Sequence, residues 1–355
     1  MLKNALDILR CPVDFERLVL DRGEPEADGH ILEGDLRCES CGAGYPIRKG
    51  VPHLVPEDAA IVDGADMGAL QERTIERFGW EWQTYEQWGW LPDYPDVAEA
   101  QEKFYGGLIE HTHAAFWGKS LFEKEDLRPG DLVLDAGCGN GRFSKCASEM
   151  GATVVGVDLG WGVYSAFNNL RHKKNVHIAR GDIFRLPVSD GTFDRVFSIG
   201  VLMHTGNAKL ATQKISMKAK TNGLVLAHVY GKGLPTYEFL DKSIRYVTTR
   251  LSIDSQVRFA RNMARFCRYL KREPWKFRLY QKIFPHLNLL PTEHHMYDWW
   301  SAPIATHHTL GEVGGWFNEV NCNVVRSNPN VDDAASDRNR RHQHAAVTVL
   351  ARRKR

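Results

Sequence analysis

The sequence predicts an α/β protein built around an open, mainly parallel sheet, and three observations support this prediction. An apolar stretch at 132–134 reads as a buried strand that runs through a glycine-rich turn into a helix. A β-branched stretch at 152–158 follows and ends in an acid. Two further apolar stretches follow, of which 175–183 has Asp182 next to its end and 192–204 ends in a histidine. Polar groups gathered at the carboxyl ends of parallel strands form the usual ligand crevice of such sheets.

Composition bounds the class of protein. The chain has 355 residues, of which 43% are hydrophobic and 25% charged, as in ordinary globular proteins. Its length predicts one large core plus a smaller domain, and its net charge of +2 does not by itself favour nucleic acid. No apolar run approaches the ~20 residues of a membrane span. The seven cysteines form no regular framework, so we expect a cytoplasmic protein.

Residues 1–58 are expected to form a small zinc-ribbon-like domain. Cys11-Pro-Val-Asp14 and Cys38-Glu-Ser-Cys41 are two short knuckles on either side of a turn-rich stretch. So small a unit has too little core to fold without a metal. The predicted zinc ligands are therefore Cys11, Asp14, Cys38 and Cys41, with Asp14 in the place of a fourth cysteine. This aspartate leaves a metal-free remnant of a ribbon as the alternative.

Residues 59–130 are expected to join the ribbon to the sheet, first as a linker and then as aromatic-rich helices. Five large aromatic residues fall between Trp80 and Trp90. They either pack a helix onto the core or form a lid over a bound ligand. Apolar residues at helical spacing across 98–125 predict one or two further helices.

The glycine-rich turn differs from a dinucleotide-binding turn in its spacing. Gly137, Gly139 and Gly141 span four residues, whereas the glycines of G-x-G-x-x-G span five. Asp135 precedes them, and a carboxylate suits a ligand that carries an ammonium group. The pattern D-x-G-x-G-x-G, with Cys138 as a small residue inside it, resembles the first motif of class I methyltransferases that use S-adenosylmethionine. That resemblance implies a Rossmann-like sheet of seven strands, the last one antiparallel, within residues 131–355.

The resemblance continues along the next three predicted strands. Asp158, followed by Leu159, ends the second strand, where a carboxylate can accept both ribose hydroxyls. Asp182 and Ile183 match the family positions that meet the adenine amino group and cover its ring. The stretch 192–204, with Ser198, resembles the fourth motif. The cofactor contacts so predicted are Asp135, Gly137, Cys138, Gly139, Gly141, Asp158, Leu159, Asp182, Ile183 and Ser198.

Three residues are candidates for a catalytic role near the transferred methyl group. His204 lies at the exit of the fourth predicted strand, and His228 and Tyr230 lie on the fifth. The ends of these strands should face the methyl group. A general base is needed only if the methylated atom belongs to a hydroxyl or an amide.

A helical insertion is expected at 232–290, between the fifth and sixth strands. Residues 231–290 contain 13 Lys and Arg against 4 Asp and Glu. This excess reads either as solvated helix faces or as a basic cap over an anionic acceptor; RNA is a further option, although the aromatics of this region are equally explained by packing. The stretch 293–309 resembles the polar substrate wall that precedes strand six in glycan and small-molecule methyltransferases.

Three functions therefore compete. The first is methyl transfer from S-adenosylmethionine to a small-molecule or glycan-type acceptor, at oxygen or nitrogen. The second is methylation of rRNA or tRNA, because residues 2–56 resemble the small zinc-ribbon proteins that partner tRNA and rRNA methyltransferases, in Leu6-Asp-Ile-Leu-Arg-Cys-Pro and Tyr45-Pro-Ile-Arg-Lys-Gly-Val-Pro. That resemblance implies a docking or stabilising role for the ribbon. The third is a non-catalytic scaffold that binds cofactor or partner proteins.

Overall fold

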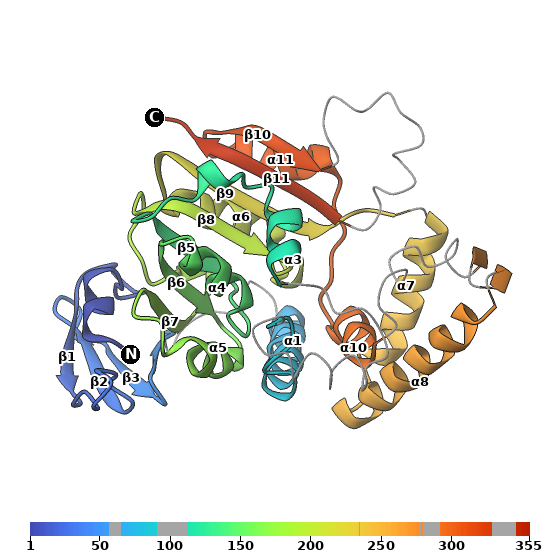
Figure 1. Ribbon diagram of the computed structural model, residues 1–355, viewed down its shortest axis with the longest axis horizontal. Coiled ribbons are helices and arrows are strands. Elements are labelled where there is room, and N and C mark those ends of the chain that lie inside the picture. The colour runs from blue at the N-terminus through green and yellow to red at the C-terminus, as the bar shows by residue number, and fades with distance from the viewer. Residues whose placement is uncertain are drawn as a thin grey trace.

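An 11-stranded sheet forms the centre of the computed structural model, which describes residues 1–56, 65–90, 112–233, 235–273, 275–276, 278–279, 292–328 and 346–355 (Figure 1). Its strand order is β1-β2-β3-β4-β7-β6-β5-β8-β9-β11-β10. The strands are β1 (Leu18–Arg22), β2 (Gly34–Cys38), β3 (Gly44–Arg48), β4 (Val51–Leu54), β5 (Leu132–Ala136), β6 (Thr153–Asp158), β7 (Val176–Gly181), β8 (Phe193–Ile199), β9 (Ala219–Tyr230), β10 (Cys322–Asn328) and β11 (Ala346–Arg353).

The described helices lie before, between and after the parallel strands, and from β5 to β9 the order is β-α-β-α-β-β-α-β. They are α1 (Ala65–Thr84), α3 (Thr112–Ser120), α4 (Arg142–Glu149), α5 (Gly162–Leu170), α6 (Ala208–Lys218), α7 (Pro235–Thr248), α8 (Ile253–Lys271), α10 (Glu293–Ser301) and α11 (Leu310–Asn318). Four 3₁₀ turns are η1 (Lys3–Asp7), η2 (Lys124–Asp126), η3 (Ile183–Arg185) and η4 (Leu202–His204). None of the described helices is long and apolar enough to cross a bilayer.

The central strands are buried on both faces, which explains their nearly continuous apolar sequences. Val133 of β5 belongs to a core cluster with residues of α4 and α5, whereas its neighbour Leu134 belongs to one with residues of α6 and α11. Successive side chains of a strand point to opposite faces of the sheet. Helices α4 and α5 therefore cover one face, and α6 and α11 cover the other.

The expected seven-stranded sheet is not confirmed, because the sheet has 11 strands. Strands β5 to β11 come from residues 131–355, and β11 runs antiparallel to both β9 and β10. The sheet continues past β7, however, since β4 of the ribbon pairs with it in parallel through His53–Arg180 and Leu54–Gly181. An exposed β7 edge would leave unpaired backbone groups. Pairing with β4 satisfies them and joins the ribbon to the main sheet.

The ribbon is also joined to the sheet through its β3–β4 hairpin. Lys49 and Gly50 form the two-residue turn, with φ of 49° and 82°, as a type I′ hairpin turn requires. A Cβ atom on Gly50 would lie 2.2 Å from the ring of Phe167 on α5. The buried ribbon residues Leu36 and Ile47 share one core cluster with the strands of the sheet. Ribbon and sheet thus bury a continuous core.

Helices α1, α7, α8 and α10 gather beyond the carboxyl ends of the strands (Figure 1). Buried residues of α7, α8 and α10 form a third cluster that includes Tyr237, Ala264, Cys267, Met296 and Trp300, and the partly buried Trp80 of α1 packs against it. Helices α7 and α8 occupy most of the insertion expected at 232–290, of which residues 234, 274, 277 and 280–290 lie outside the described residues. Residues 57–64 and 91–111, within the expected linker and approach helices, also lie outside them.

Candidate functional site

A cavity of about 570 Å³ opens at the carboxyl ends of β5 to β9. One end of it is lined by the glycine turn after β5 and by the residues that end β6 and β7. The other end is lined by the exits of β8 and β9 and by side chains of α1 and α10. The site therefore joins two regions, one built by the sheet and one closed by helices.

The glycine turn has a shape that side chains would destroy. Gly137 has φ of 94°, and a Cβ on it would lie 2.3 Å from a methyl group of Val201. Gly139 has φ of 54° and lies under the indole of Trp82. Both glycines and Cys138 line the cavity. Gly141, the N-cap of α4, does not line it; a Cβ there would meet Leu170 at 2.6 Å.

Asp158 presents its carboxylate to the cavity from the end of β6. Its Oδ2 accepts a 3.0 Å hydrogen bond from the amide of Gly139, and its Oδ1 accepts a 2.8 Å bond from the amide of Gly160. Burial raises the pKa of this carboxyl above its usual value. Each oxygen retains a second lone pair, so the pair can still accept the two hydroxyls of a vicinal diol. Leu159 lines the cavity beside it.

Asp182 and Ile183 line the same end of the cavity, after β7. Asp182 caps the 3₁₀ turn η3 by accepting a 2.9 Å hydrogen bond from the amide of Phe184 through Oδ1. Burial raises the pKa of Asp182. The structure thus brings together two acids and an apolar side chain, a set that can bind the hydroxyls, the amino group and the flat face of a nucleoside.

Two predicted cofactor contacts lie behind the cavity wall rather than on it. The buried Asp135 accepts a 2.6 Å hydrogen bond from the hydroxyl of Ser144 on α4, and burial raises its pKa to about 7. The buried Ser198 donates a 2.7 Å bond to the carbonyl of Ala136. Neither residue lines the cavity. Both tie the glycine turn to its neighbouring elements.

The three catalytic candidates all line the helical end of the cavity. Nδ1 of His204 lies 2.6 Å from the carbonyl oxygen of Ile304; since a carbonyl only accepts, Nδ1 carries the proton and Nε2 keeps a lone pair. Burial lowers the pKa of His204 to about 3 and raises that of Tyr230 well above its usual value. His204 is therefore neutral and Tyr230 is a protonated donor. Nδ1 of His228 lies 2.7 Å from the Thr348 hydroxyl.

Aromatic side chains of α1 and α10 close this end of the cavity. The aromatic residues between Trp80 and Trp90 were expected either to form a lid or to pack on the core, and the structure contains both kinds. Trp82 and Trp88 line the cavity, whereas Trp90 is 1% exposed and packs in the core. Trp299 of α10 stacks on Tyr230 with ring centroids 4.6 Å apart. His294, His295 and Asp298, from the predicted polar substrate wall, complete the lining with Phe78.

Sequence reasoning missed two cations and an amide on the cavity wall. Arg142, Lys119 and Asn140 all line it. The guanidinium of Arg142 lies 5.6 Å from the ring centroid of Trp82. Arg142 directly follows the glycine turn in the sequence, and this position could have predicted that its side chain lies at the cavity. Lys119, on α3, carried no local signal because only the packing of α3 places it here.

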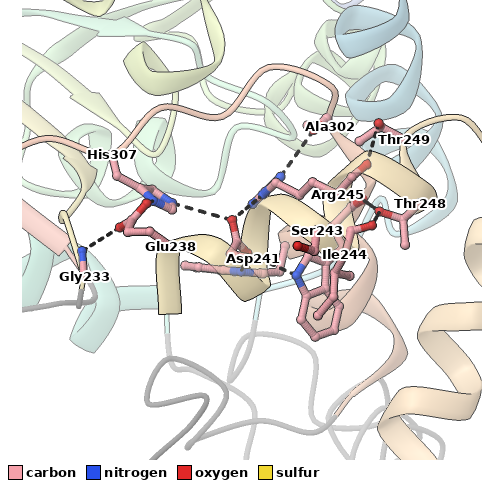
Figure 2. A network of polar contacts seen from close by, with 12 residues as sticks. Gly233, Glu238, Asp241, Ser243, Ile244, Arg245, Thr248, Thr249, Ala302 and His307 are labelled. Atoms are coloured by element: carbon pink, nitrogen blue, oxygen red, sulfur yellow. Dashed lines mark hydrogen bonds and ion pairs between the residues drawn. The ribbon is translucent and has the colours of Figure 1, made fainter. Parts of the chain in front are cut away.

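A buried polar network anchors α10 and lies next to the cavity (Figure 2). Asp241 of α7, 2% exposed, accepts hydrogen bonds from the indoles of Trp299 and Trp300 at 2.9 and 3.1 Å. Its other oxygen pairs with Nε of Arg245 at 2.8 Å. Figure 2 shows Arg245 reaching on to the carbonyl of Ala302, and His307 joining Glu238 at 2.7 Å to Asp241 at 4.0 Å. The insertion helix α7 thereby sets the position of the aromatic wall.

The four predicted metal ligands of the ribbon come together. The ligand atoms of Cys11, Asp14, Cys38 and Cys41 lie within 4.8 Å of one another. The Sγ atoms of Cys11 and Cys41 are 3.7 Å apart, close to the ~3.8 Å edge of a tetrahedron with zinc–sulfur bonds of about 2.3 Å. Three thiolates and a carboxylate fit Zn²⁺, and this cluster could hold it. Within the described residues it is the one group of this kind.

Two family models match the chain. Residues 134–227 match the model described as "Methyltransferase domain", and residues 3–50 match the model described as "Trm112p-like protein". The chain therefore carries a methyltransferase domain and a Trm112p-like segment. Both resemblances drawn from the sequence are confirmed for these segments.

Curated relatives share part of the chain. A demethylmenaquinone methyltransferase of Corynebacterium kroppenstedtii is 33% identical over 107 residues, 30% of this chain and 45% of the relative. A malonyl-[acyl-carrier protein] O-methyltransferase of Serratia marcescens is 28% identical over 116 residues, 33% of this chain and 45% of the relative. The chain thus spans less than half the length of these relatives. Among solved structures, one chain of the complex between the Haloferax volcanii Trm112 methyltransferase activator and the putative methyltransferase is 13% identical in sequence to this protein. The match has a TM-score of 0.42 and covers 76% of this chain and 97% of the solved chain.

Proposed function

We propose that the protein transfers a methyl group from S-adenosylmethionine to a small-molecule or glycan-type acceptor held under α1 and α10. One observation carries this proposal: a single cavity joins the acid-lined glycine turn to an aromatic wall. Asp158 would hold the ribose hydroxyls, and Asp182 with Ile183 the adenine. Gly137, Cys138 and Gly139 would allow close approach of the cofactor to the backbone. When bound, S-adenosylmethionine supplies an electrophilic methyl group on a sulfonium.

Asp135, Gly141 and Ser198 take a different role in this proposal from the one that the sequence favoured. They stabilise the turn from behind, since none of them lines the cavity. Arg142 and Lys119 are the cations on the wall, and either can pair with a carboxylate in the cavity. The cofactor itself carries a carboxylate, so these cations do not require an anionic acceptor.

The catalytic candidates act mainly by positioning, which can contribute on the order of 7 to 11 kcal/mol to such a transfer. The neutral His204 accepts a hydrogen bond at Nε2 from an acceptor O–H or N–H and aims that atom at the methyl group. Tyr230 donates a hydrogen bond, because burial keeps its phenol protonated. The stacked Trp299 and the ring of Phe78 exclude water from the same space.

The aromatic wall favours a small acceptor over a folded RNA. Helices α1 and α10 cover the site, and the wall is mostly aromatic and apolar, as small-molecule sites are. The two curated relatives reported above are named for demethylmenaquinone and for a malonyl group on a carrier protein. Their names support an acceptor of small size in this chain as well.

RNA methylation is the second candidate, and the Trm112p-like segment at 3–50 is the observation that favours it. In our proposal this segment has a structural role instead. Strand β4 completes the sheet beside β7, and Nε2 of His53 contacts the hydroxyl of Tyr164 at 2.9 Å. Tyr164 in turn stacks on Trp161, over which Arg180 lies at 4.1 Å. The ribbon thus supports the elements next to Asp158.

A labelling experiment separates the candidates. The purified chain is incubated with methyl-labelled S-adenosylmethionine and either a small-molecule extract or total RNA. Label is expected in the small-molecule fraction, and transfer to RNA alone would sink the proposal. Asp158→Ala should abolish the transfer, whereas Asp21→Ala, an exposed acid of the ribbon, should not. If calorimetry detects no binding of S-adenosylmethionine, only the non-catalytic scaffold remains of the three functions.

A further inference from the structure

Exposed apolar side chains concentrate on the helices that follow β9. Among the described residues, 12 large hydrophobic side chains are exposed, and seven of them lie between 239 and 279. They are Phe239, Tyr246, Val247, Phe266, Tyr269, Trp275 and Leu279. The sequence allowed core packing for the aromatics of this region, but Tyr246, Phe266, Tyr269 and Trp275 are 65%, 49%, 54% and 64% exposed. Such a concentration marks an interaction surface, whereas scattered single residues would not.

Helix α8 carries two of these side chains, Phe266 and Tyr269, and Trp275 follows it in the chain. Its inner side, with Ala260, Ala264 and Cys267, packs in the third core cluster. Its outer side presents Arg258, Arg265, Phe266, Tyr269 and Arg272, all exposed. Arg265 lies two turns after Arg258, and Phe266, Tyr269 and Arg272 follow Arg265 at steps of one or three residues. We define this outer side, together with Trp275, as the α8 face.

The α8 face is cationic as well as apolar. Helix α8 contains four Arg and one Lys against a single acid, Asp254, in its first turn. Nζ of Lys276 lies 5.5 Å from the ring centroids of both Tyr269 and Trp275. Cations and amphipathic rings are therefore interleaved on the α8 face and directly beside it.

We propose that the α8 face binds an anionic lipid surface. Arginines next to Trp, Tyr and Phe are the composition of helices that lie in a membrane interface. Single-stranded nucleic acid instead requires a basic groove with rings for stacking. The α8 face lies along the outer side of a single helix, whose inner side is packed in the third core cluster, and the exposed Val247 and Leu279 have no ring on which a base could stack. The observations therefore favour lipid over RNA.

The position of the α8 face relates it to the cavity. Helix α8 packs on α10, and Arg261 pairs with Glu293 of α10 at 2.7 Å. Helix α10 carries Asp298 and Trp299 of the cavity wall. A lipid surface at α8 would thus lie one helix away from the acceptor region. A role in delivering an apolar acceptor rests on the proposed function, whereas lipid binding itself does not.

Vesicle flotation tests the proposal with the full chain. We expect binding to vesicles of phosphatidylcholine with phosphatidylglycerol at low salt, weaker binding at high salt, and little binding to phosphatidylcholine alone. Arg265→Glu with Arg272→Glu should weaken binding at least about 25-fold, at about fivefold for each cation lost. Phe266→Ser with Trp275→Ser should weaken it at every salt concentration.

A charge-matched control uses two exposed arginines of the ribbon. Arg22→Glu with Arg37→Glu makes the same change of charge away from α8 and should leave vesicle binding unchanged. Equal binding to neutral vesicles, or equal loss in the control, would overturn the proposal. So would RNA that binds more tightly than vesicles and loses affinity with the same α8 variants. Calorimetry with S-adenosylmethionine shows that each variant keeps its cofactor site, so failure of lipid binding is distinguishable from failure of the proposed function.

Discussion

Asp241 holds Trp299 in place through a 2.9 Å hydrogen bond from the indole nitrogen to a carboxylate that is 2% exposed. The ring of the same Trp299 faces the cavity, where it stacks on Tyr230. An acid of the insertion, more than fifty residues away in sequence, therefore shapes the acceptor wall without touching the acceptor. Arg245 balances the buried charge.

Asp241→Ala is expected to destabilise the protein by about 3–5 kcal/mol, because it leaves the guanidinium of Arg245 buried without its partner. Denaturant unfolding measures this. Glu319→Ala, which breaks the exposed pair with Lys209, is the control and should cost at most about 1 kcal/mol. In the folded fraction of Asp241→Ala, the KM for the acceptor should rise while the affinity for S-adenosylmethionine holds. Equal unfolding costs for the two variants would contradict the buried network.

The β3–β4 hairpin predicts a contrast between two glycines. Gly50 and Gly42 both have left-handed φ, 82° and 76°. A Cβ on Gly50 would clash with Phe167, whereas one on Gly42 meets nothing within 4 Å. Gly42→Ala should therefore cost only about 1 kcal/mol of backbone strain, and Gly50→Ala several times more. Thermal unfolding of the two variants checks this, and similar melting temperatures would argue against close packing of the ribbon on α5.

The ribbon is expected to bind one zinc ion per chain. Cys38→Ser should lose it, and Asp14→Cys should hold it more strongly against a chelator, because thiolates bind zinc better than a carboxylate does. Chelation should lower the melting temperature of the whole chain in one transition, since β4 belongs to the main sheet. Metal analysis and calorimetry measure both. A chain refolded with zinc that retains none would instead identify a remnant ribbon.

The buried Asp135 predicts a pH dependence of stability. Its pKa is about 7 in the folded protein against 3.8 for the free side chain, so the folded state binds this proton more tightly. The resulting stabilisation is fully present below about pH 4 and is lost as the pH rises through about 7. The Asp135→Asn variant has no proton to lose at this position, so its free energy of unfolding should not fall in this way. From about pH 4 to about pH 7, the free energy of unfolding of the variant should therefore rise relative to that of the wild type by at most roughly 4 kcal/mol. A constant difference across this range would exclude a buried protonated carboxyl.

His204 should remain neutral in mildly acidic solution. Burial lowers its pKa to about 3, whereas an ordinary histidine titrates near 6.5. The folded state therefore disfavours this proton, and the stability associated with the neutral ring falls as the pH drops from about 6.5 toward 3. Imidazole ¹⁵N shifts, assigned by comparison with His204→Gln, should keep the Nδ1–H pattern at pH 5. Titration near pH 6.5 would mean that the ring is not buried against Ile304.

Local sequence was sufficient where backbone geometry was at issue. The glycine spacing at 137–141 predicted a turn that admits no side chain at Gly137, and the acids Asp158 and Asp182 do line one cavity. The four ribbon ligands also come together as predicted. The glycine pattern lies within one short motif, and the ribbon ligands lie in two knuckles joined by a hairpin. Asp158 and Asp182 instead meet because each comes at the carboxyl end of one of two neighbouring parallel strands.

Side-chain direction at Asp135 and Ser198 could not be read in the same way. Both lie on strands that are buried on two faces, where the apolar sequence gives no alternation to show which way a polar residue points. Packing of α4 turns Asp135 toward Ser144, away from the cavity.

The sequence by itself determined the class of sheet, the glycine turn and the acids beside it, because these depend on spacing over a few residues. Only the tertiary structure decided that β4 of the ribbon extends the sheet, that Lys119 and Arg142 face the cavity, and that α10 closes it. These contacts join segments far apart in the chain. They form only when the helices and strands bury their apolar faces together, and no local spacing records which segments will meet.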